Sequence, residues 1–352
     1  MKENNRALII LTPGFPANET DSTCLPFPQL FVNTLRQVNP SLEVIVLTFQ
    51  YPFEKKEYQW NNLRVIAFGG KNKGKLNRLM VWRAVLKKIQ TIVQQQPVAG
   101  ILNFWLGECG LIGKYAAKKH RLKHYTWLLG QDARAKNRYV SFIKPHAKSL
   151  IAVSDYIAGE FYSNYNIKPA NIIPPGVNTK ETVVKDRVRD IDVLGAGSLI
   201  PLKQYVIFVT VVAKLAITHP SIRAVLCGDG IQRALLQKLI DGTGLSGNIE
   251  LSGELSNEAV KALMQRSKIL LHPSSYEGFA TVYTEALYAG AHVIGFCRPM
   301  DEIFKNQHVV KTQEEMVARV AALLDDTNLN HDSVITWPIE ATCQKVLALY
   351  GI

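Results

Sequence analysis

Residues 272–290 read His-Pro-Ser-Ser-Tyr-Glu-Gly-Phe-Ala-Thr-Val-Tyr-Thr-Glu-Ala-Leu-Tyr-Ala-Gly. The apolar run that ends near His272 predicts a strand, and residues 281–289 predict a helix that stops at Gly290. A second apolar run, residues 292–296, predicts the next strand. Strand, loop, helix and strand in this order form the repeating unit of a parallel α/β sheet.

The same alternation continues on both sides of this stretch. The Pro/Gly-rich residues 171–178 and the polar residues 179–190 interrupt it, which predicts a domain boundary. We therefore expect an α/β fold with two Rossmann-like, doubly wound parallel-sheet domains facing across a cleft. The expected strands are 7–12, 43–49, 63–68, 99–104, 124–129, 149–153, 191–196, 222–227, 249–251, 269–272 and 292–296, and the expected helices are 76–94, 111–119, 203–217, 231–241, 256–266, 281–289, 313–324 and 339–349.

Two carboxylates stand at the predicted strand end and on the following helix. Glu277 lies in the loop and Glu285 about one turn into the helix. The backbone N–H groups of Gly278, Phe279 and Ala280 lead into the helix N-terminus, which carries partial positive charge. Glycine at 278 allows a ligand to approach the backbone closely. Carboxylates beside such amides suit a ligand with hydroxyls at both ends and anionic oxygens between them, as in a nucleotide sugar.

A glycine turn follows the predicted strand 191–194. It begins like the dinucleotide fingerprint G-x-G-x-x-G, but Ile200 stands where close helix packing favours Gly or Ala, and no acid follows about 20 residues later. Pro201 is expected to open the next helix, with Lys203 in its first turn. A helix N-terminus with a lysine favours a phosphate site formed with Gly197 and Ser198. A glycine turn with a solvated lysine is the structural alternative.

Within the frame Pro-Ser-x-x-Glu-Gly-Phe…Glu-Ala-Leu-x-x-Gly, Glu277 and Glu285 resemble the signature of glycosyltransferase family 4. Its members are retaining enzymes of the GT-B fold. The resemblance extends over nearly the whole chain: residues 222–230 resemble the family's Gly-Asp-Gly turn near the nucleotide, and residues 197–203 match its phosphate loop. A bare pair of glutamates at this spacing would carry no such information, whereas the framed pair does.

The resemblance also implies roles for domains and residues. Residues 1–178 would bind the acceptor, with the helix in 338–352 packing back on them, and residues 179–337 would bind the nucleotide sugar. Gly253 would lie where backbone holds the base, and Gly14 in the glycine loop near the acceptor. Asp132 resembles the acid of a Gly-x-Asp near the acceptor or sugar.

The implied chemistry is sugar transfer with retention, in which the leaving phosphate takes the acceptor proton. Lys203 and the amides of residues 278–280 would stabilise charge growing on the diphosphate. Glu277 would orient hydroxyls of the donor sugar and Glu285 the ribose hydroxyls. With that charge carried by the protein, we expect neither a metal nor another cofactor.

Three departures from the family pattern concern specificity. Ser198 stands where the family often has Arg, Leu129 where a His often faces the donor sugar, and a single glycine, Gly14, where the acceptor loop often has two. They leave the expected fold and donor class intact. They leave the sugar and the acceptor geometry open.

The composition fits a cytosolic globular protein. The chain has 352 residues, 47% of them apolar, and no apolar run approaches the ~20 residues of a membrane span. The apolar stretch after the first six residues is too short for a signal peptide. The five cysteines are scattered without a C-x-x-C, which fits buried, inert thiols in a reduced compartment rather than a zinc site.

Positive charge is concentrated in the first half. Residues 1–180 carry 25 Lys and Arg against 10 Asp and Glu, a net charge of +15. The whole chain has a net charge of +12, so the second half is slightly negative. Residues 71–88 hold seven basic residues and no acid, interleaved with apolar ones. They predict either a core-facing apolar stripe with a solvated basic face, or attachment to an anionic membrane surface. We do not expect nucleic acid as a partner, because no binding motif accompanies the charge.

The sequence therefore predicts a hexosyltransferase that uses a UDP- or GDP-sugar and a glycan or lipid-linked acceptor in building bacterial surface polysaccharide. It would act in the cytoplasm or on the inner face of the cytoplasmic membrane. Two alternatives remain: a non-catalytic nucleotide-sugar-binding protein of the same fold, and an NAD-dependent enzyme, against which Ile200 argues.

Overall fold

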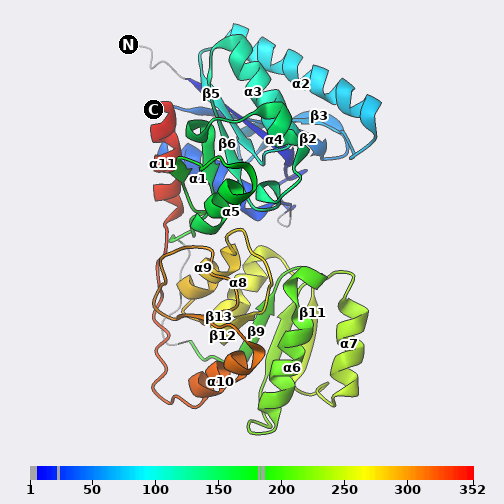
Figure 1. Ribbon diagram of the computed structural model, residues 1–352, viewed down its shortest axis with the longest axis vertical. Coiled ribbons are helices and arrows are strands. Elements are labelled where there is room, and N and C mark those ends of the chain that lie inside the picture. The colour runs from blue at the N-terminus through cyan, green and yellow to red at the C-terminus, as the bar shows by residue number, and fades with distance from the viewer. Residues whose placement is uncertain (1–5, 22–23, 181–182, 184–186) are drawn as a thin grey trace. The chain divides into compact units, whose positions relative to one another are not determined.

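The protein is described by a computed structural model that covers residues 6–21, 24–180, 183 and 187–352. The chain forms two compact units, and the first contains both chain ends: Met1–Gly176 with Ile339–Ile352, and Val177–Pro338. The predicted boundaries, after residue 178 and before residue 338, lie two residues and one residue from those of the structure. Figure 1 shows the helices and strands of each unit.

The first unit is built on a mainly parallel sheet. Among the described residues the sheet has eight strands in the order β3-β4-β2-β1-β5-β6-β7-β8, and only the β3–β4 pair is antiparallel. The edge strand β3 was not expected, because its residues are polar and alternate in exposure rather than forming an apolar run. The strands are β1 (Ala7–Gly14), β2 (Glu43–Tyr51), β3 (Lys55–Trp60), β4 (Leu63–Phe68), β5 (Val98–Phe104), β6 (Lys123–Leu128), β7 (Leu150–Ala152) and β8 (Asn171–Ile172).

Helices cover both faces of this sheet. On one face, α2 and α3 pack apolar side chains such as Val85 and Ile112 against β1 and β2. On the other, Phe31 of α1 lies edge-on to Phe104 and Trp127, and α11 lies beside α1 (Figure 1). The helices are α1 (Pro26–Val38), α2 (Lys75–Gln95), α3 (Glu108–His120), α4 (Arg138–Ile143), α5 (Asp155–Tyr165) and α11 (Ile339–Tyr350).

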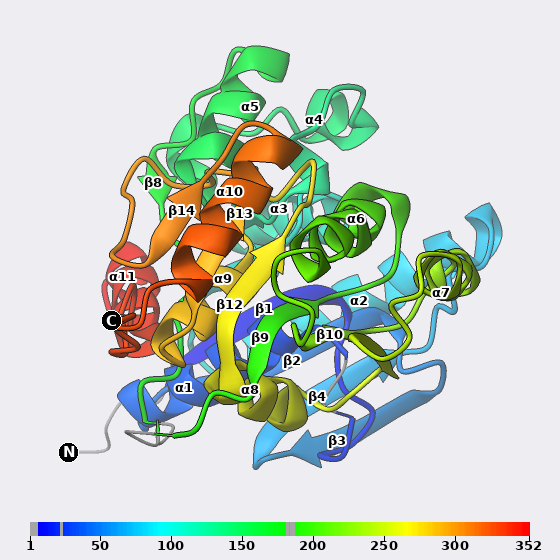
Figure 2. The ribbon, with the colours of Figure 1, turned by 90° about the horizontal axis from the view of Figure 1, so that it is seen from below.

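The second unit is a parallel sheet between two helical layers. Its described strands follow the order β11-β10-β9-β12-β13-β14. Helices α6, α7 and α10 cover one face and α8 and α9 the other (Figure 2). The strands are β9 (Ile191–Ala196), β10 (Ala224–Cys227), β11 (Ile249–Gly253), β12 (Ser267–His272), β13 (His292–Gly295) and β14 (Gln307–Val309), and the helices are α6 (Tyr205–Ala216), α7 (Arg233–Gly242), α8 (Asn257–Arg266), α9 (Thr281–Tyr288) and α10 (Gln313–Leu324).

The strand order reverses beside β9. The chain builds outward from β9 through β10 to β11, and then returns to place β12 on the opposite side of β9. Such a switch point leaves a crevice outside the carboxyl ends of its strands, which is where ligands bind in open α/β sheets. The loops after β9 and β12, singled out from the sequence, therefore emerge side by side.

One local prediction at this edge was wrong. Pro201–Lys203 form a separate 3-10 turn, and Gln204 follows in the left-handed conformation with φ +51°. The helix α6 begins only at Tyr205, so Lys203 precedes it instead of standing in its first turn. The described part of the chain contains no helix long and apolar enough to cross a membrane.

Candidate active site

Glu277 is held at the switch point by the loop that joins β12 to α9. Ser274 and Ser275 fix this loop to the turn after β9: Ser275 donates its backbone N–H to the carbonyl oxygen of Leu202 over 3.0 Å, and the Ser274 hydroxyl donates to the same oxygen over 3.2 Å. The loop is thus tied to the 3-10 turn that carries Lys203. Two segments more than 70 residues apart in sequence become one structural element.

This attachment brings three ionisable side chains together. Lys203 Nζ lies 2.5 Å from Glu277 Oε1, and His272 Nε2 lies 2.6 Å from the same oxygen. The side chain of His272 is 1% exposed, that of Glu277 11% and that of Lys203 20%. The cluster is therefore largely shielded from water, and its charges interact strongly.

The cluster holds Glu277 ionised. Burial alone would raise the pKa of its carboxyl group, but the hydrogen bond from His272 and the charge of Lys203 outweigh burial and lower the pKa to about 2. Burial lowers the pKa of His272. A neutral His272 that donates Nε2–H to Glu277 leaves Nδ1 as a buried acceptor, for which the described residues provide no hydrogen-bond partner.

Glycines allow the neighbouring loops to approach each other. Gly228 has φ +137°, and a Cβ there would lie 2.0 Å from the carbonyl oxygen of Gly197. At Gly197 itself, φ is +146° and a Cβ would lie 3.0 Å from the buried hydroxyl of Tyr205. Gly253, at the end of β11, accepts a hydrogen bond from the N–H of Gly228 over 2.8 Å. The predicted residues Gly197 and Gly253 thus belong to one glycine-lined edge formed by the ends of β9, β10 and β11.

The start of α9 presents backbone donors at the same sheet edge. Ala280 adopts the left-handed conformation with φ +61°, and no side chain caps the helix. The N–H groups of Phe279 and Ala280 donate no hydrogen bond within the described part of the chain. Gly278 precedes them, and the ring of Phe279 packs against Trp337 with 5.5 Å between ring centroids. Uncapped donors at a helix start, together with Lys203, are suited to an anion.

The other predicted residues of the second unit lie at this edge or on α9. Ser198 is exposed in the turn after β9. Glu285 is half-buried in the second turn of α9, whose first turn contains no acid. The structure therefore brings Lys203 and Glu277 into direct contact, and places Glu285 on the helix that begins beside them.

Asp132 belongs to the first unit, where its geometry differs from the role expected of it. The carboxylate is buried in the 3-10 turn after β6 and accepts three backbone hydrogen bonds, from Leu106 (2.8 Å), Leu129 (3.1 Å) and Gly130 (2.9 Å). Burial raises the pKa of this carboxyl group, although the three hydrogen bonds lower it in part. Because the backbone occupies both carboxylate oxygens, Asp132 joins the loops after β5 and β6, and we assign it a structural role.

Gly14 ends β1 in the same unit. Its φ is not positive, and a Cβ would meet Leu25, Tyr51 and Cys24 at ordinary van der Waals distances of 3.6 to 3.8 Å. The backbone at this position therefore does not require glycine. The loop that follows is held by Asp21, which accepts hydrogen bonds from the Tyr51 hydroxyl (2.7 Å) and the Ala17 N–H (3.0 Å).

A cavity of about 560 Å³ lies at the carboxyl ends of β5 and β6 in the first unit. Gly107, at the N-terminus of α3, contributes to its wall, together with three basic residues, Arg134, Lys136 and Arg138. Asp132 also lines the cavity, but its carboxylate is engaged by the backbone. The walls are therefore cationic.

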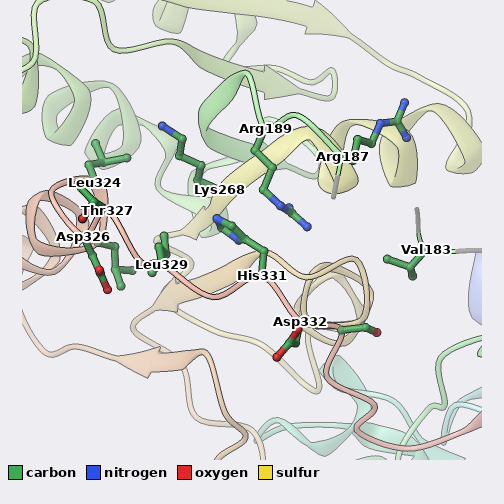
Figure 3. A pocket seen from close by; sticks show the side chains of 12 residues that line it. Val183, Arg187, Arg189, Lys268, Leu324, Asp326, Thr327, Leu329, His331 and Asp332 are labelled. Atoms are coloured by element: carbon green, nitrogen blue, oxygen red, sulfur yellow. The ribbon is translucent and has the colours of Figure 1, made fainter. Parts of the chain in front are cut away.

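A larger cavity, of about 720 Å³, occupies the opposite edge of the second sheet (Figure 3). Arg189 precedes β9, and Lys268 stands near the start of β12. The side chains of Lys268 and Arg187 extend in opposite directions (Figure 3), and the guanidinium of Arg189 donates to the backbone carbonyls of Met264, Ser267 and Ala289. The basic groups thus extend apart or bind backbone carbonyls, so we assign this cavity no catalytic part.

Sequence reasoning missed two residues at the carboxyl-terminal edge of the second sheet. His272 was taken only as a strand end, although its distance of five residues from Glu277 across a loop could have suggested the contact. Arg233, at the start of α7, donates from Nη2 to the carbonyl of Leu251 (3.2 Å), and its Nη1 is buried without a partner in the described structure. Nothing in the local sequence distinguishes Arg233 from a surface arginine.

Comparison with known proteins assigns the second unit. Residues 179–334 match the family model of glycosyl transferases group 1. The second unit is a group 1 glycosyl transferase domain. The chain is 28% identical over 148 residues to the MMP alpha-(1->4)-mannosyltransferase of Mycolicibacterium hassiacum, which covers 41% of this chain and 36% of that protein. It is 22% identical over 221 residues to the GPI3 subunit of the Saccharomyces cerevisiae phosphatidylinositol N-acetylglucosaminyltransferase, covering 56% and 49%.

Similar solved structures extend the likeness to both units. A glycosyltransferase from Rickettsia africae matches with a TM-score of 0.73 at 16% identity, covering 98% of each chain. Anabaena Alr3699/HepE in complex with UDP and glucose matches with a TM-score of 0.69 at 15% identity, covering 98% of this chain and 95% of that one. The group 1 domain is thus part of a GT-B fold, as the sequence predicted. The chain spans half or less of the length of the curated relatives described above.

Proposed function

We propose that the protein is a retaining glycosyltransferase that transfers a hexosyl unit from a nucleoside-diphosphate sugar to a glycan or lipid-linked acceptor. One observation carries the proposal: Lys203, Glu277 and His272 meet at the switch point of a group 1 domain, beside the N–H groups of Phe279 and Ala280, which donate to no other described residue. Positive charge and ordered carboxylate at one sheet edge are what a diphosphate joined to a hydroxyl-rich sugar requires.

The proposed roles follow from position and charge. Lys203 and the N–H groups at the start of α9 stabilise the negative charge that develops on the diphosphate. Glu277, kept ionised by its two partners, accepts hydrogen bonds from donor-sugar hydroxyls, and Glu285 holds the ribose. The bond from the anomeric carbon to the phosphate oxygen breaks, a bond from that carbon to the acceptor oxygen forms, and the acceptor proton passes to the leaving phosphate. Lys203 and these N–H groups balance the charge of the diphosphate without a metal ion.

We also propose that the first unit binds the acceptor. Its basic cavity beside Gly107 and the excess of Lys and Arg in residues 1–180 favour an anionic acceptor. Building of a bacterial surface polysaccharide on the cytoplasmic side of the membrane supplies acceptors of that class.

Nucleotide binding tests the donor site. Thermal unfolding is followed with UDP, GDP, ADP, CMP and NAD, with and without EDTA, because a ligand at 100 times its Kd should stabilise by about 2.7 kcal/mol. A shift with UDP or GDP alone, unchanged by EDTA, is expected. A shift with NAD alone would overturn the proposal.

Turnover tests catalysis. Glu277→Gln should lower the release of nucleoside diphosphate from the sugar nucleotide while leaving nucleotide binding in place. Glu250→Gln, an exposed acid on β11, is the matched control and should change neither. If the unchanged protein binds the nucleotide but neither transfers nor hydrolyses any sugar nucleotide with any acceptor, the non-catalytic alternative holds.

A further inference from the structure

Helix α2 has two apolar stripes, and only one of them is used inside the first unit. Val81, Val85, Ile89 and Ile92 recur at helical spacing and are buried against the sheet. They account for the core-facing stripe that the sequence allowed. The apolar residues at the start of the helix do not belong to it.

Leu76, Leu79 and Met80 lie on the opposite side of α2. They are spaced i, i+3 and i+4, so their side chains are neighbours on one helix face. Their exposed fractions are 80%, 50% and 62%. Three adjacent large apolar side chains in water are unfavourable unless a partner covers them.

Cations surround this exposed face. Arg83 and Lys87 continue it along the helix at steps of four residues, and Lys71 and Lys73 precede it in the loop before α2. None of these four groups forms an ion pair among the described residues. The chain has no Asp or Glu between Glu57 and Glu108.

The start of the helix adds to the positive potential. Asp or Glu commonly occupies the first turn of a helix, where it compensates the helix dipole. The first turn of α2 contains no acid, and its N-cap is Gly74, without a side-chain cap. Exposed apolar side chains therefore stand at the positive end of the helix, among unpaired cations.

We propose that this face of α2, defined by Leu76, Leu79, Met80, Arg83 and Lys87, docks on an anionic lipid bilayer. The apolar trio enters the boundary between headgroups and acyl chains, while the cations meet lipid phosphates. A bilayer satisfies both features at once, because it is apolar just beneath an anionic surface. The inference deepens the proposed function, since it places the enzyme where a lipid-linked acceptor resides.

Vesicle binding of the full chain tests the proposal. Sucrose-loaded vesicles of phosphatidylcholine, with and without phosphatidylglycerol, are sedimented with the protein at low and high salt. We expect binding to the anionic vesicles that weakens with salt. Each cation near the surface contributes about fivefold in partitioning, so R83Q/K87Q should weaken binding about 25-fold. Equal binding to both vesicle types would overturn the proposal.

Two triple variants test whether the apolar side chains insert into the bilayer. L76S/L79S/M80S should weaken binding to the anionic vesicles at least tenfold, whereas I217S/I303S/I335S, which removes three exposed apolar residues of the second unit, should not. Binding that is insensitive to the first triple variant, or equally sensitive to both, would contradict insertion.

Depth and self-association complete the test. Leu79→Trp should show additional blue-shifted emission and quenching by brominated lipid on anionic vesicles, whereas Ile217→Trp should show neither. A dimer in solution that L76S/L79S/M80S dissociates would assign the face to a second copy instead of lipid. The triple variant should keep the nucleotide-induced thermal shift, so failure of membrane docking is distinguishable from failure of the proposed function.

Discussion

The contact between Lys203 and Glu277 permits a quantitative prediction. Unit charges 2.5 Å apart attract each other by about 7 kcal/mol at an effective dielectric constant of 20. Desolvation opposes this attraction by several kcal/mol per ion, and both side chains keep some exposure. We therefore expect a net coupling of about 2 kcal/mol between them.

A double-mutant cycle measures this coupling. Lys203→Met and Glu277→Gln should each destabilise the second unit by about 2–3 kcal/mol, because each leaves the other partner in a largely buried site without its counter-charge. The double variant should be about 2 kcal/mol more stable than the sum of the two single effects predicts. Hydrogen exchange of peptides from β12 and α9 reports this locally, where 2 kcal/mol corresponds to about 30-fold in exchange rate.

Peptides from β1 and β5 in the first unit provide the internal control and should not change. Single-variant effects that add within about 0.5 kcal/mol would refute the reasoning, because additivity means that the two charges do not interact. The pH dependence gives a second check. The carboxyl pKa of about 2 lies below its ordinary 4.5, so the ionised form stabilises the fold above pH 4.5 and this stability is lost as the pH falls towards 2. The stability difference between the unchanged protein and Glu277→Gln should shrink over that range.

Three further predictions concern single positions. Gly228→Ala places a Cβ 2.0 Å from a carbonyl oxygen at φ +137° and should destabilise the second unit by at least about 2 kcal/mol in urea unfolding, whereas Gly242→Ala, at an open helix end, should change it by no more than about 1 kcal/mol. Asp132→Asn turns an amide donor towards backbone donors and should destabilise the first unit by about 2–4 kcal/mol without changing nucleotide affinity; a loss of turnover with unchanged stability would instead restore a catalytic role. Burial lowers the pKa of His308 to about 4, and its ring lies 3.1 Å from that of His292. The neutral ring therefore stabilises the fold above pH 6.5, and this stability is lost as the pH falls to 4. His308→Gln should reduce the dependence of the unfolding free energy on pH over this range, and an unchanged dependence would show that other groups cause it.

The second unit was largely predictable because its sequence is locally consistent. Each buried strand there is an apolar run followed by a turn, and Gly290 ends its helix where the pattern places it. The first unit was less predictable from its sequence. Helix α1 begins Pro26-Phe-Pro-Gln, which can be taken for a loop although proline is common at the first positions of a helix. The edge strand β3 has no apolar run, since only one of its ends is buried.

The sequence indicated on which loop and helix the candidate site residues lie, but not which side chains they contact. The frame around Glu277 and Glu285 pointed to the loop after β12. The link between Lys203 and Glu277, however, depends on Ser274 and Ser275 reaching the carbonyl of Leu202, which no sequence spacing reveals. For Asp132, a motif resemblance predicted a catalytic role. In the structure its carboxylate accepts hydrogen bonds from three backbone N–H groups in the loops after β5 and β6, which the sequence does not reveal.

The two proposals both depend on the electrostatics of this protein. At the edge proposed for the donor, Lys203 is paired with Glu277, so a bound diphosphate would share or displace that contact. The N–H groups of Phe279 and Ala280 donate to no other group in the described part of the chain and would need no rearrangement. Along α2, Arg83 and Lys87 form no ion pair with any of the residues that the structure describes. The first set of charges is arranged for selectivity, because binding must exchange one pair for another. The second is arranged for attraction at a distance, which salt weakens and apolar insertion then completes. In these proposals the charges of α2 attract the membrane surface that holds the acceptor, whereas Lys203 and the N–H groups at the start of α9 bind the diphosphate of the donor.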